Sequence, residues 1–464
     1  DGTAILYISH RMEEIARLIS DEMGKPVAES YSAEIVPVLD LMQYFARKTE
    51  KLLKPRKLNI GLLGLMGRTS KVIYQPVGVV GIISPWNFPF SIPLGEVSMA
   101  LMAGNTVVLK PSELTPLVGK KIGEIFEKAG LPKNVLQILT GDGKTGAALV
   151  EAAPDKIMFT GSVATGKKIA ASAAKNLTPV VLELGGKDPM IVFADADLEK
   201  AASGAVWGAF TNSGQACSSV ERLYVEESIA GRFTEMVVEK TKMLQQNLGS
   251  EETTDIGSMV SEDQLEIVED HVADFVESGA EILIGGKRNT GFDGAFFEPT
   301  VIANADNSMR GMCEETFGPT LPIAVFRTEK EAIDLANASD FGLTARVWTK
   351  DIGKGKRVAG EIRAGTVMVN EVLYTHGIGQ TPWGGFKDSG YGRTHGLEGL
   401  MELVVPQHLH VNRFTLTPDV WWFGYSKNAI ETFKDMARYF ASGSYLRSIR
   451  LAPRFLKRLR ELMK

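Results

Sequence analysis

Apolar and polar positions in the first part of the chain follow two spacings, one typical of strands and one of helices. The run 77–83 has no polar side chain, which indicates a parallel strand buried on both faces. The stretch 11–23 places Ile15, Leu18 and Ile19 on one face, which indicates an amphipathic helix. Further strands are predicted at 106–109, 135–139, 156–160 and 180–184, and further helices at 34–51, 118–129, 146–152 and 166–174. This alternation predicts a doubly wound α/β sheet.

A second α/β region is predicted after Gly185-Gly186. Its strands are expected at 190–193, 222–225, 281–284, 321–326, 345–349 and 365–370, and its helices at 198–211 and 229–246. The fold class is therefore α/β with two sheet-containing domains.

Composition supports a globular protein. The chain has 464 residues, of which 44% are hydrophobic and 23% charged, enough for two or three domains. Two cysteines are too few for a disulfide framework and fit a reducing, cytoplasmic compartment. The six histidines have no metal-ligand spacing, so no metal site is expected. No apolar run approaches the ~20 residues that span a bilayer.

The net charge of −5 is unevenly distributed. Residues 409–464 hold 11 Lys and Arg against 4 Asp and Glu, whereas the remaining 408 residues hold 40 against 52. An acidic body argues against nucleic acid as a partner.

Three polar residues stand where α/β enzymes carry their chemistry. Cys217 follows a polar loop containing glycine, which suits an accessible thiol, although a lone cysteine is more often a small buried hydrophobe. Glu183 ends an apolar strand, where burial would raise its pKa toward that of a general base; the alternative is a carboxylate capping the next turn. Asn87 lies between two prolines and could stabilise an oxyanion, or could bond its own backbone.

Together these segments resemble the aldehyde dehydrogenase superfamily, from about Met12 to Val411. The resemblance includes the motifs Lys110-Pro-Ser-Glu113, Phe159-Thr-Gly-Ser162 with Gly166, Glu314-Glu-Thr-Phe-Gly-Pro319, Phe341-Gly-Leu-Thr344 and Pro382-Trp-Gly-Gly-Phe-Lys387. It implies oxidation of an aldehyde to the carboxylic acid through a thioester on Cys217. Asn87 would hold the oxyanion, and Glu183 would activate the hydrolytic water.

The resemblance also implies an NAD cofactor, with NADP possible for the family. Lys110 and Glu113 would hold the adenosine ribose, and Ser162, with Gly161 and Gly166, would approach the pyrophosphate. The residues expected around the nicotinamide are Trp86, Leu184, Glu315 and Phe317.

The resemblance further implies a domain plan and an assembly. Residues 1–57 and 75–185 would form a Rossmann-like cofactor domain whose N-terminal part is missing, and residues 186–400 the catalytic domain. Residues 58–74 and 401–411 would form a small β oligomerisation element of a homodimer or homotetramer.

Residues 412–464 depart from the family pattern. They contain the aromatic run Trp421-Trp-Phe-Gly-Tyr425, a predicted helix at 428–440 and a basic amphipathic helix at 453–464. Such an aromatic run should not remain in water. It is expected to dock on its own or a neighbouring subunit; the alternative is a peripheral contact with an anionic membrane.

Two other functions stay open at this level. A semialdehyde dehydrogenase would need a basic residue for the substrate carboxylate, and the loop 213–219 offers none. The side chains expected at the substrate tunnel, Phe88, Ile92 and Thr211, favour apolar aldehydes instead. A catalytically retired scaffold relative need not keep nucleophile, base and oxyanion donor together.

Overall fold

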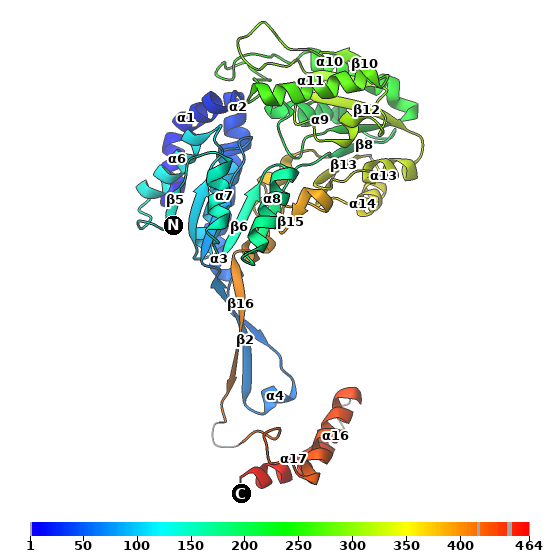
Figure 1. The fold of residues 1–464 in the computed structure, drawn as a ribbon. Coiled ribbons are helices and arrows are strands. Elements are labelled where there is room, and N and C mark those ends of the chain that lie inside the picture. Colours follow the sequence, from blue (N-terminus) through cyan, green and yellow to red (C-terminus); the bar gives the residue numbers. More distant parts are fainter. Residues whose placement is uncertain (1, 415–417, 443–447, 464) are drawn as a thin grey trace. The chain divides into compact units, whose positions relative to one another are not determined.

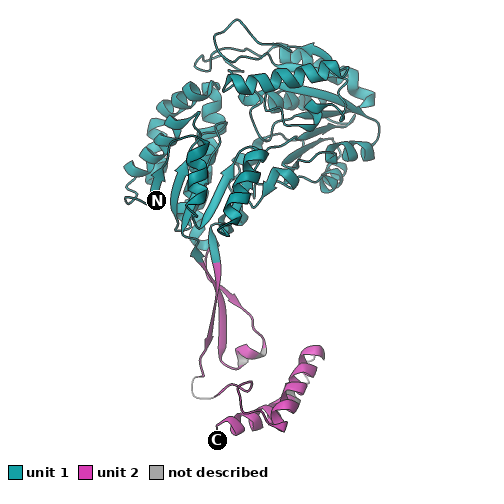
Figure 2. Ribbon diagram, viewed as in Figure 1, with its two compact units in different colours: residues 1–52, 75–405 teal, residues 53–74, 406–464 magenta. Residues whose placement is uncertain are grey.

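A computed structural model describes residues 2–414, 418–442 and 448–463 of the chain (Figure 1). It divides into two compact units, residues 1–52 with 75–405 and residues 53–74 with 406–464 (Figure 2). The first unit contains both large sheets. The second contains the strands of the expected oligomerisation element together with the C-terminal extension.

The first sheet has six strands in the order β15-β7-β6-β3-β4-β5. Its strands are β3 (Val79–Ile83), β4 (Thr106–Lys110), β5 (Leu136–Ile138), β6 (Lys156–Thr160), β7 (Val180–Glu183) and β15 (Gly390–Tyr391). All pair in parallel except β15, which joins the edge antiparallel, with Gly390 opposite Glu183. A short segment from late in the chain therefore completes the sheet beside a predicted site residue.

Helices cover this sheet in the way a doubly wound fold requires (Figure 1). They are α1 (Thr3–Met23), α2 (Val27–Glu29), α3 (Val36–Leu52), α5 (Ser91–Met102), α6 (Pro116–Lys128), α7 (Gly143–Glu151) and α8 (Val163–Ala174), with a π-helical segment η1 (Ser30–Ile35) before α3. Leu149 of α7 and Ile169 of α8 pack in one apolar cluster with Ile157, Phe159 and Leu182 of the strands.

The second sheet has seven strands in the order β10-β11-β12-β9-β8-β13-β14. They are β8 (Pro189–Val192), β9 (Arg222–Glu226), β10 (Glu281–Ile284), β11 (Thr300–Ala303), β12 (Thr320–Phe326), β13 (Thr344–Trp348) and β14 (Thr366–Val369). The accompanying helices are α9 (Leu198–Phe210), α10 (Ala230–Lys242), α11 (Glu262–Glu277), α12 (Arg310–Cys313), α13 (Glu329–Asn337) and α14 (Ile352–Glu361), whereas α15 (Gly396–Met401) lies against α5 of the first sheet. Only β10, at the edge, is antiparallel to its neighbour among these strands.

The second unit combines a three-stranded sheet, β1-β2-β16, with a helical hairpin. Its elements are β1 (Arg56–Leu58), α4 (Leu62–Leu65), β2 (Arg68–Pro76), β16 (Val404–Asn412), α16 (Lys427–Ser442) and α17 (Ser448–Leu462). Of the predicted extension, residues 415–417, 443–447 and 464 lie outside the described residues. Helix α17 begins five residues before Pro453, where the sequence predicted its start. No helix of the described residues is long and apolar enough to cross a membrane.

The α/β fold class predicted from the sequence is confirmed, and two differences have physical reasons. Helix α8 begins at Val163 rather than 166, because the Ser162 hydroxyl accepts a hydrogen bond from the Thr165 N–H and caps it. Helix α5 was not predicted, because it is buried over nearly its whole length and therefore lacks a polar face.

Candidate active site

The predicted catalytic residues converge at the ends of strands from both halves of the first unit. Asn87 follows β3, Glu183 ends β7, and Cys217 follows the 3₁₀ turn η2 (Thr211–Gly214) that leads out of α9. All three line one cavity of about 290 Å³. The other predicted residues on its wall are Trp86, Gly161, Ser162, Leu184, Glu315 and Phe317. Lys110, Glu113 and Gly166 do not line this cavity.

The loop before Cys217 is held in an unusual backbone conformation. Asn212 and Ser213 both have positive φ angles, 51° and 56°, which residues other than glycine rarely adopt. The carboxylate of Glu29 accepts hydrogen bonds from the Thr211 hydroxyl and the Asn212 N–H. Thr211, expected at the substrate tunnel, is instead one of the residues that fix this loop.

Hydrogen bonds join the Asn87 segment to the Cys217 loop. The Asn87 side-chain amide donates to the carbonyl of Gln215 at 3.1 Å, and the Asn212 amide donates to the Asn87 carbonyl at 3.0 Å. The Asn87 side chain thus binds the nucleophile loop rather than its own backbone. This hydrogen bond uses one of the two N–H groups of the Asn87 side-chain amide, and the second N–H takes no part in it.

A fully buried ion pair between Lys25 and Glu34 fixes the backbone at Asn87. The sequence gave no reason to single out either residue of the pair. Lys25 Nζ lies 2.8 Å from the Glu34 carboxylate and also donates to the Asn87 carbonyl at 2.8 Å. Glu34 in turn accepts hydrogen bonds from the backbone N–H groups of Phe90 and Ser91. The ammonium also lies 4.3 Å from the centre of the Phe88 ring, so this ring packs against Lys25.

Glu183 is a buried carboxyl group whose oxygens have no hydrogen-bond partner among the described residues. Burial raises its pKa well above the ordinary value, and the neighbouring Glu96 raises it further, while Arg393 acts in the opposite direction. Glu183 does not cap the following turn, because the Gly186 N–H donates to Glu315 instead, at 2.9 Å. Its arrangement suits a group that takes up a proton.

The surroundings of the Cys217 thiol disfavour its ionisation. Burial raises its pKa, and the carboxylates of Asp188, Glu315 and Glu183 raise it further. The backbone around it is tight, since a Cβ on Gly186 would lie 2.4 Å from the Cys217 carbonyl oxygen. A nucleophilic role therefore requires that a base or positive charge act on this thiol.

A second, enclosed cavity adjoins Cys217 and Glu183, and the sequence did not predict it. Its other walls are Ile92, Glu96, Thr160, Leu184, Leu343, His376, Trp383, Thr394 and His395. Burial raises the pKa of Glu96 to about 8 and lowers that of His376 to about 4. Of the three expected tunnel residues, only Ile92 lies on this wall. Glu96 and the histidines were not recognised because their significance depends on partners far away in sequence.

The cavity wall suits a dinucleotide. The N-terminus of α8 carries the Ser162 cap at the cavity, a favourable position for a phosphate group. A Cβ on Gly166 would lie 2.6 Å from the Leu184 side chain, so glycine is needed where the helix approaches the strand. Trp86 and Phe317 meet edge to face at 5.4 Å. At the end of β4, Lys110 pairs with Glu113 at 2.7 Å.

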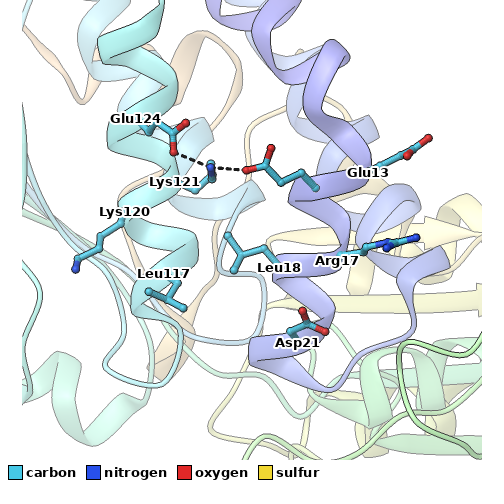
Figure 3. A pocket seen from close by; sticks show the side chains of 9 residues that line it. Glu13, Arg17, Leu18, Asp21, Leu117, Lys120, Lys121 and Glu124 are labelled. Carbon is cyan, nitrogen blue, oxygen red and sulfur yellow. Dashed lines mark hydrogen bonds and ion pairs between the residues drawn. The ribbon is translucent and has the colours of Figure 1, made fainter.

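A depression larger than the cavity at Cys217 lies elsewhere in the first unit, between α1 and α6 (Figure 3). Its wall is mostly charged, and Lys121 bridges Glu14 and Glu124 across it. It contains neither of the chain's cysteines. Size alone therefore does not identify the site.

The fold and cavity define a two-sheet, dinucleotide-binding α/β enzyme. The family model for the aldehyde dehydrogenase family matches residues 3–409, and the chain belongs to this family. The 4,4'-diapolycopene aldehyde oxidase of Methylomonas sp. is 41% identical, covering 91% of this chain and 79% of the relative. The putative succinate-semialdehyde dehydrogenase [NADP(+)] 2 of Mycobacterium bovis is 40% identical, covering 89% and 79%.

Solved structures agree with this family assignment. The betaine aldehyde dehydrogenase of Staphylococcus aureus in complex with NAD+ superposes with a TM-score of 0.85 at 38% identity, covering 91% of this chain and 83% of that one. These comparisons confirm the family resemblance and the NAD(P)-linked aldehyde dehydrogenase class predicted from the sequence.

The Lys25–Glu34 pair generates a stability prediction. We expect Lys25→Met to lower the free energy of unfolding by about 3–5 kcal/mol, because it leaves the Glu34 charge buried without its partner. The double variant Lys25→Met/Glu34→Gln should be less destabilised than Lys25→Met alone. Thermal and urea unfolding measure both, and equal loss in the two variants would contradict a dominant role for the unpaired charge.

Proposed function

We propose that Cys217, Asn87 and Glu183 carry out the oxidation of an aldehyde to its carboxylic acid. The Cys217 thiol loses its proton to water, the resulting thiolate attacks the carbonyl carbon, and the new oxyanion accepts hydrogen bonds from the Asn87 side chain and the Cys217 backbone N–H. A bound NAD would supply the acceptor for the hydride that leaves that carbon. The observation that carries the proposal is the convergence of all three residues on one cavity wall.

Glu183 completes the reaction in this proposal. Its carboxylate takes a proton from water, the water oxygen attacks the thioester carbon, and the carbon–sulfur bond breaks to release the acid and Cys217. The raised pKa and unpartnered oxygens of Glu183 support this role. Hydrolysis by such a base favours a free acid over transfer to a second thiol.

For the cofactor, we infer that NAD is preferred over NADP. The hydrogen bond from Lys110 lowers the pKa of Glu113 despite partial burial, so this carboxylate is ionised. An ionised Glu113 would accept hydrogen bonds from a ribose diol and repel a 2′-phosphate. Gly161, Ser162 and Gly166 would receive the pyrophosphate, and Trp86, Leu184, Glu315 and Phe317 the nicotinamide end.

The substrate we propose is an apolar aldehyde. The enclosed cavity beside Cys217 includes Ile92, Leu343 and Trp383, and neither cavity has a Lys or Arg among the described residues on its wall. A semialdehyde, the substrate class named for the Mycobacterium bovis relative, would leave its carboxylate unpaired there. The Methylomonas relative is named for 4,4'-diapolycopene aldehyde, which agrees with the proposal of an apolar aldehyde as substrate.

We propose a homodimer or homotetramer in the cytoplasm, assembled through residues 58–74 and 401–411. The beginning of the C-terminal extension, through Trp421, docks on its own chain in this proposal. Three contacts within the second unit support it: the ion pair of Asp419 with Arg68, the Arg68 guanidinium 5.0 Å from the Trp421 ring, and Phe414 against Gly67.

Two variants separate the steps of the reaction. With a panel of aliphatic, aromatic and carboxylated aldehydes, Cys217→Ala should abolish NAD reduction. Glu183→Gln should retain a first-turnover burst of NADH and lose steady-state turnover at least about 100-fold, because the thioester forms but is not hydrolysed. Stopped-flow absorbance measures both phases, with Cys313→Ala, at the exposed cysteine, as the control. Turnover in Cys217→Ala, or no turnover in a folded, cofactor-binding wild type, would refute the proposal and favour a scaffold role.

The coupling of Glu96 to Glu183 generates a pH prediction. Because a charge on Glu96 raises the pKa of Glu183, Glu96→Gln should lower it. Glu183 would then become the active carboxylate at lower pH, and the acid limb of the kcat–pH profile should move down by about 0.5–1 unit. Steady-state rates across the pH range measure this, with the exposed Glu235→Gln as control. A limb that stays in place or moves to higher pH would contradict the coupling.

Cofactor preference gives a third test. We expect Glu113→Ser to raise kcat/KM for NADP relative to NAD by about tenfold, because it removes a like charge facing the 2′-phosphate. The exposed Glu127→Ser on α6 should leave the ratio unchanged. A wild type that already prefers NADP would contradict the assignment of Glu113.

A further inference from the structure

The two compact units carry opposite net charges. The second unit, residues 53–74 with 406–464, holds 16 of the 51 Lys and Arg residues but only 4 of the 56 Asp and Glu residues, a net charge of +12. The first unit therefore carries −17. A charge of +12 on 81 residues favours an anionic partner for this unit.

The second unit also exposes an aromatic loop, residues 421–425. Trp421, Trp422, Phe423 and Tyr425 have exposed fractions of 40%, 56%, 85% and 62%. The family model ends at residue 409, so the loop lies outside the segment common to the family. Clustered aromatic side chains exposed to this extent indicate a surface that contacts a partner.

Arg458 of α17 fixes the aromatic loop from inside. Its guanidinium is almost fully buried and donates to the carbonyls of Val420 at 3.1 Å, Trp422 at 2.8 Å and Gly424 at 2.6 Å. It also reaches the Phe423 carbonyl at 3.4 Å. The backbone acceptors thus turn toward Arg458. A loop whose carbonyls are already hydrogen-bonded can enter an apolar environment at lower cost.

The hairpin behind the loop is internally packed. Val420, Ala429, Thr432 and Leu451 are buried. The aromatic loop is therefore presented by a scaffold with a core of its own.

Acidic side chains in the hairpin are neutralised, whereas several basic ones are not. Glu431 and Asp435 pair with Lys434, Arg438 and Arg454. Lys427, Lys457 and Arg460 have no ion-pair partner among the described residues. Ile430, Leu456 and Met463 add exposed apolar side chains to the same hairpin.

We propose that the aromatic loop and the hairpin dock on the surface of an anionic lipid bilayer. The rings of Trp422, Phe423 and Tyr425 enter the headgroup region, and the unpaired Lys and Arg side chains contact anionic headgroups. Tryptophan and tyrosine beside lysine and arginine are the combination that suits this boundary. A contact between the basic hairpins of two copies, as distinct from assembly through residues 58–74 and 401–411, would bring like charges together, which disfavours a second copy as the occupant.

The test uses the full chain and sedimentation with vesicles. Wild type should bind vesicles containing 30% phosphatidylglycerol about tenfold or more tightly than pure phosphatidylcholine vesicles, and binding should weaken as salt rises from about 0.1 to 0.5 M. Trp422→Ser/Phe423→Ser should lose binding about tenfold or more. Its matched control is Trp207→Ser/Leu177→Ser, which removes one exposed tryptophan and one exposed apolar side chain from the first unit.

Two further measurements separate the alternatives. Lys457→Glu/Arg460→Glu should lose the preference for anionic vesicles, while NAD-linked aldehyde turnover in detergent-free buffer shows that the variants remain folded. Light scattering after size exclusion reports the oligomeric state. Wild type that fails to bind anionic vesicles at low salt would overturn the proposal. So would a loop variant that changes the assembly and leaves vesicle binding intact, which would assign the loop to a second copy of this chain.

Discussion

The geometry of the active site depends on a charge pair that is entirely withdrawn from water. Removing an ammonium and a carboxylate from solvent is costly, and one ion pair rarely offsets the cost. Lys25 and Glu34 offset it by additional bonds, since Glu34 accepts two backbone N–H groups and Lys25 donates to the Asn87 carbonyl. The same bonds fix the segment after β3 against the start of α5. The position of Asn87 is therefore a consequence of how the charges at Lys25 and Glu34 are satisfied.

From that anchored segment, the electrostatics of the cavity follow. Four carboxyl groups, Glu96, Glu183, Asp188 and Glu315, are buried near one thiol, and burial raises the pKa of each. A protein gains no stability from such a cluster, because every buried carboxylate that ionises costs free energy. Because burial favours the protonated form of each, the cluster places groups that can exchange protons close to Cys217. This is the arrangement that proton transfer to and from a substrate requires.

Much of this could be predicted from the sequence, and the failures share one cause. Strands β6 and β10 have the predicted bounds, because a run of apolar residues marks each of them in the sequence without any knowledge of its neighbours. Glu183 and Asn87 were singled out because they stand at or just after the ends of apolar strands, and Cys217 because it follows a polar loop; the structure places all three on one cavity wall. Lys25, Glu96 and His395 were missed because each looks ordinary along the chain. Their importance arises from burial and from partners that only folding brings together, as when β15 returns to pair with Glu183.

The second unit shows how a chain can change where an enzyme works without changing its chemistry. Every residue that lines either cavity at Cys217 belongs to the first unit. The hairpin has its own buried residues, and Arg458 fixes the aromatic loop by hydrogen bonds to its backbone carbonyls. The second unit also carries a net charge opposite in sign to that of the first unit. Nothing in the proposed reaction requires these features, so their physical effect must fall on location. Apolar aldehydes partition into lipid, and an enzyme held at a bilayer surface meets them at a higher local concentration than one in bulk water. The apolar side chains of Ile92, Leu343 and Trp383 beside Cys217 and the aromatic loop at Trp422 are then two adaptations to one property of the substrate, its poor solubility in water.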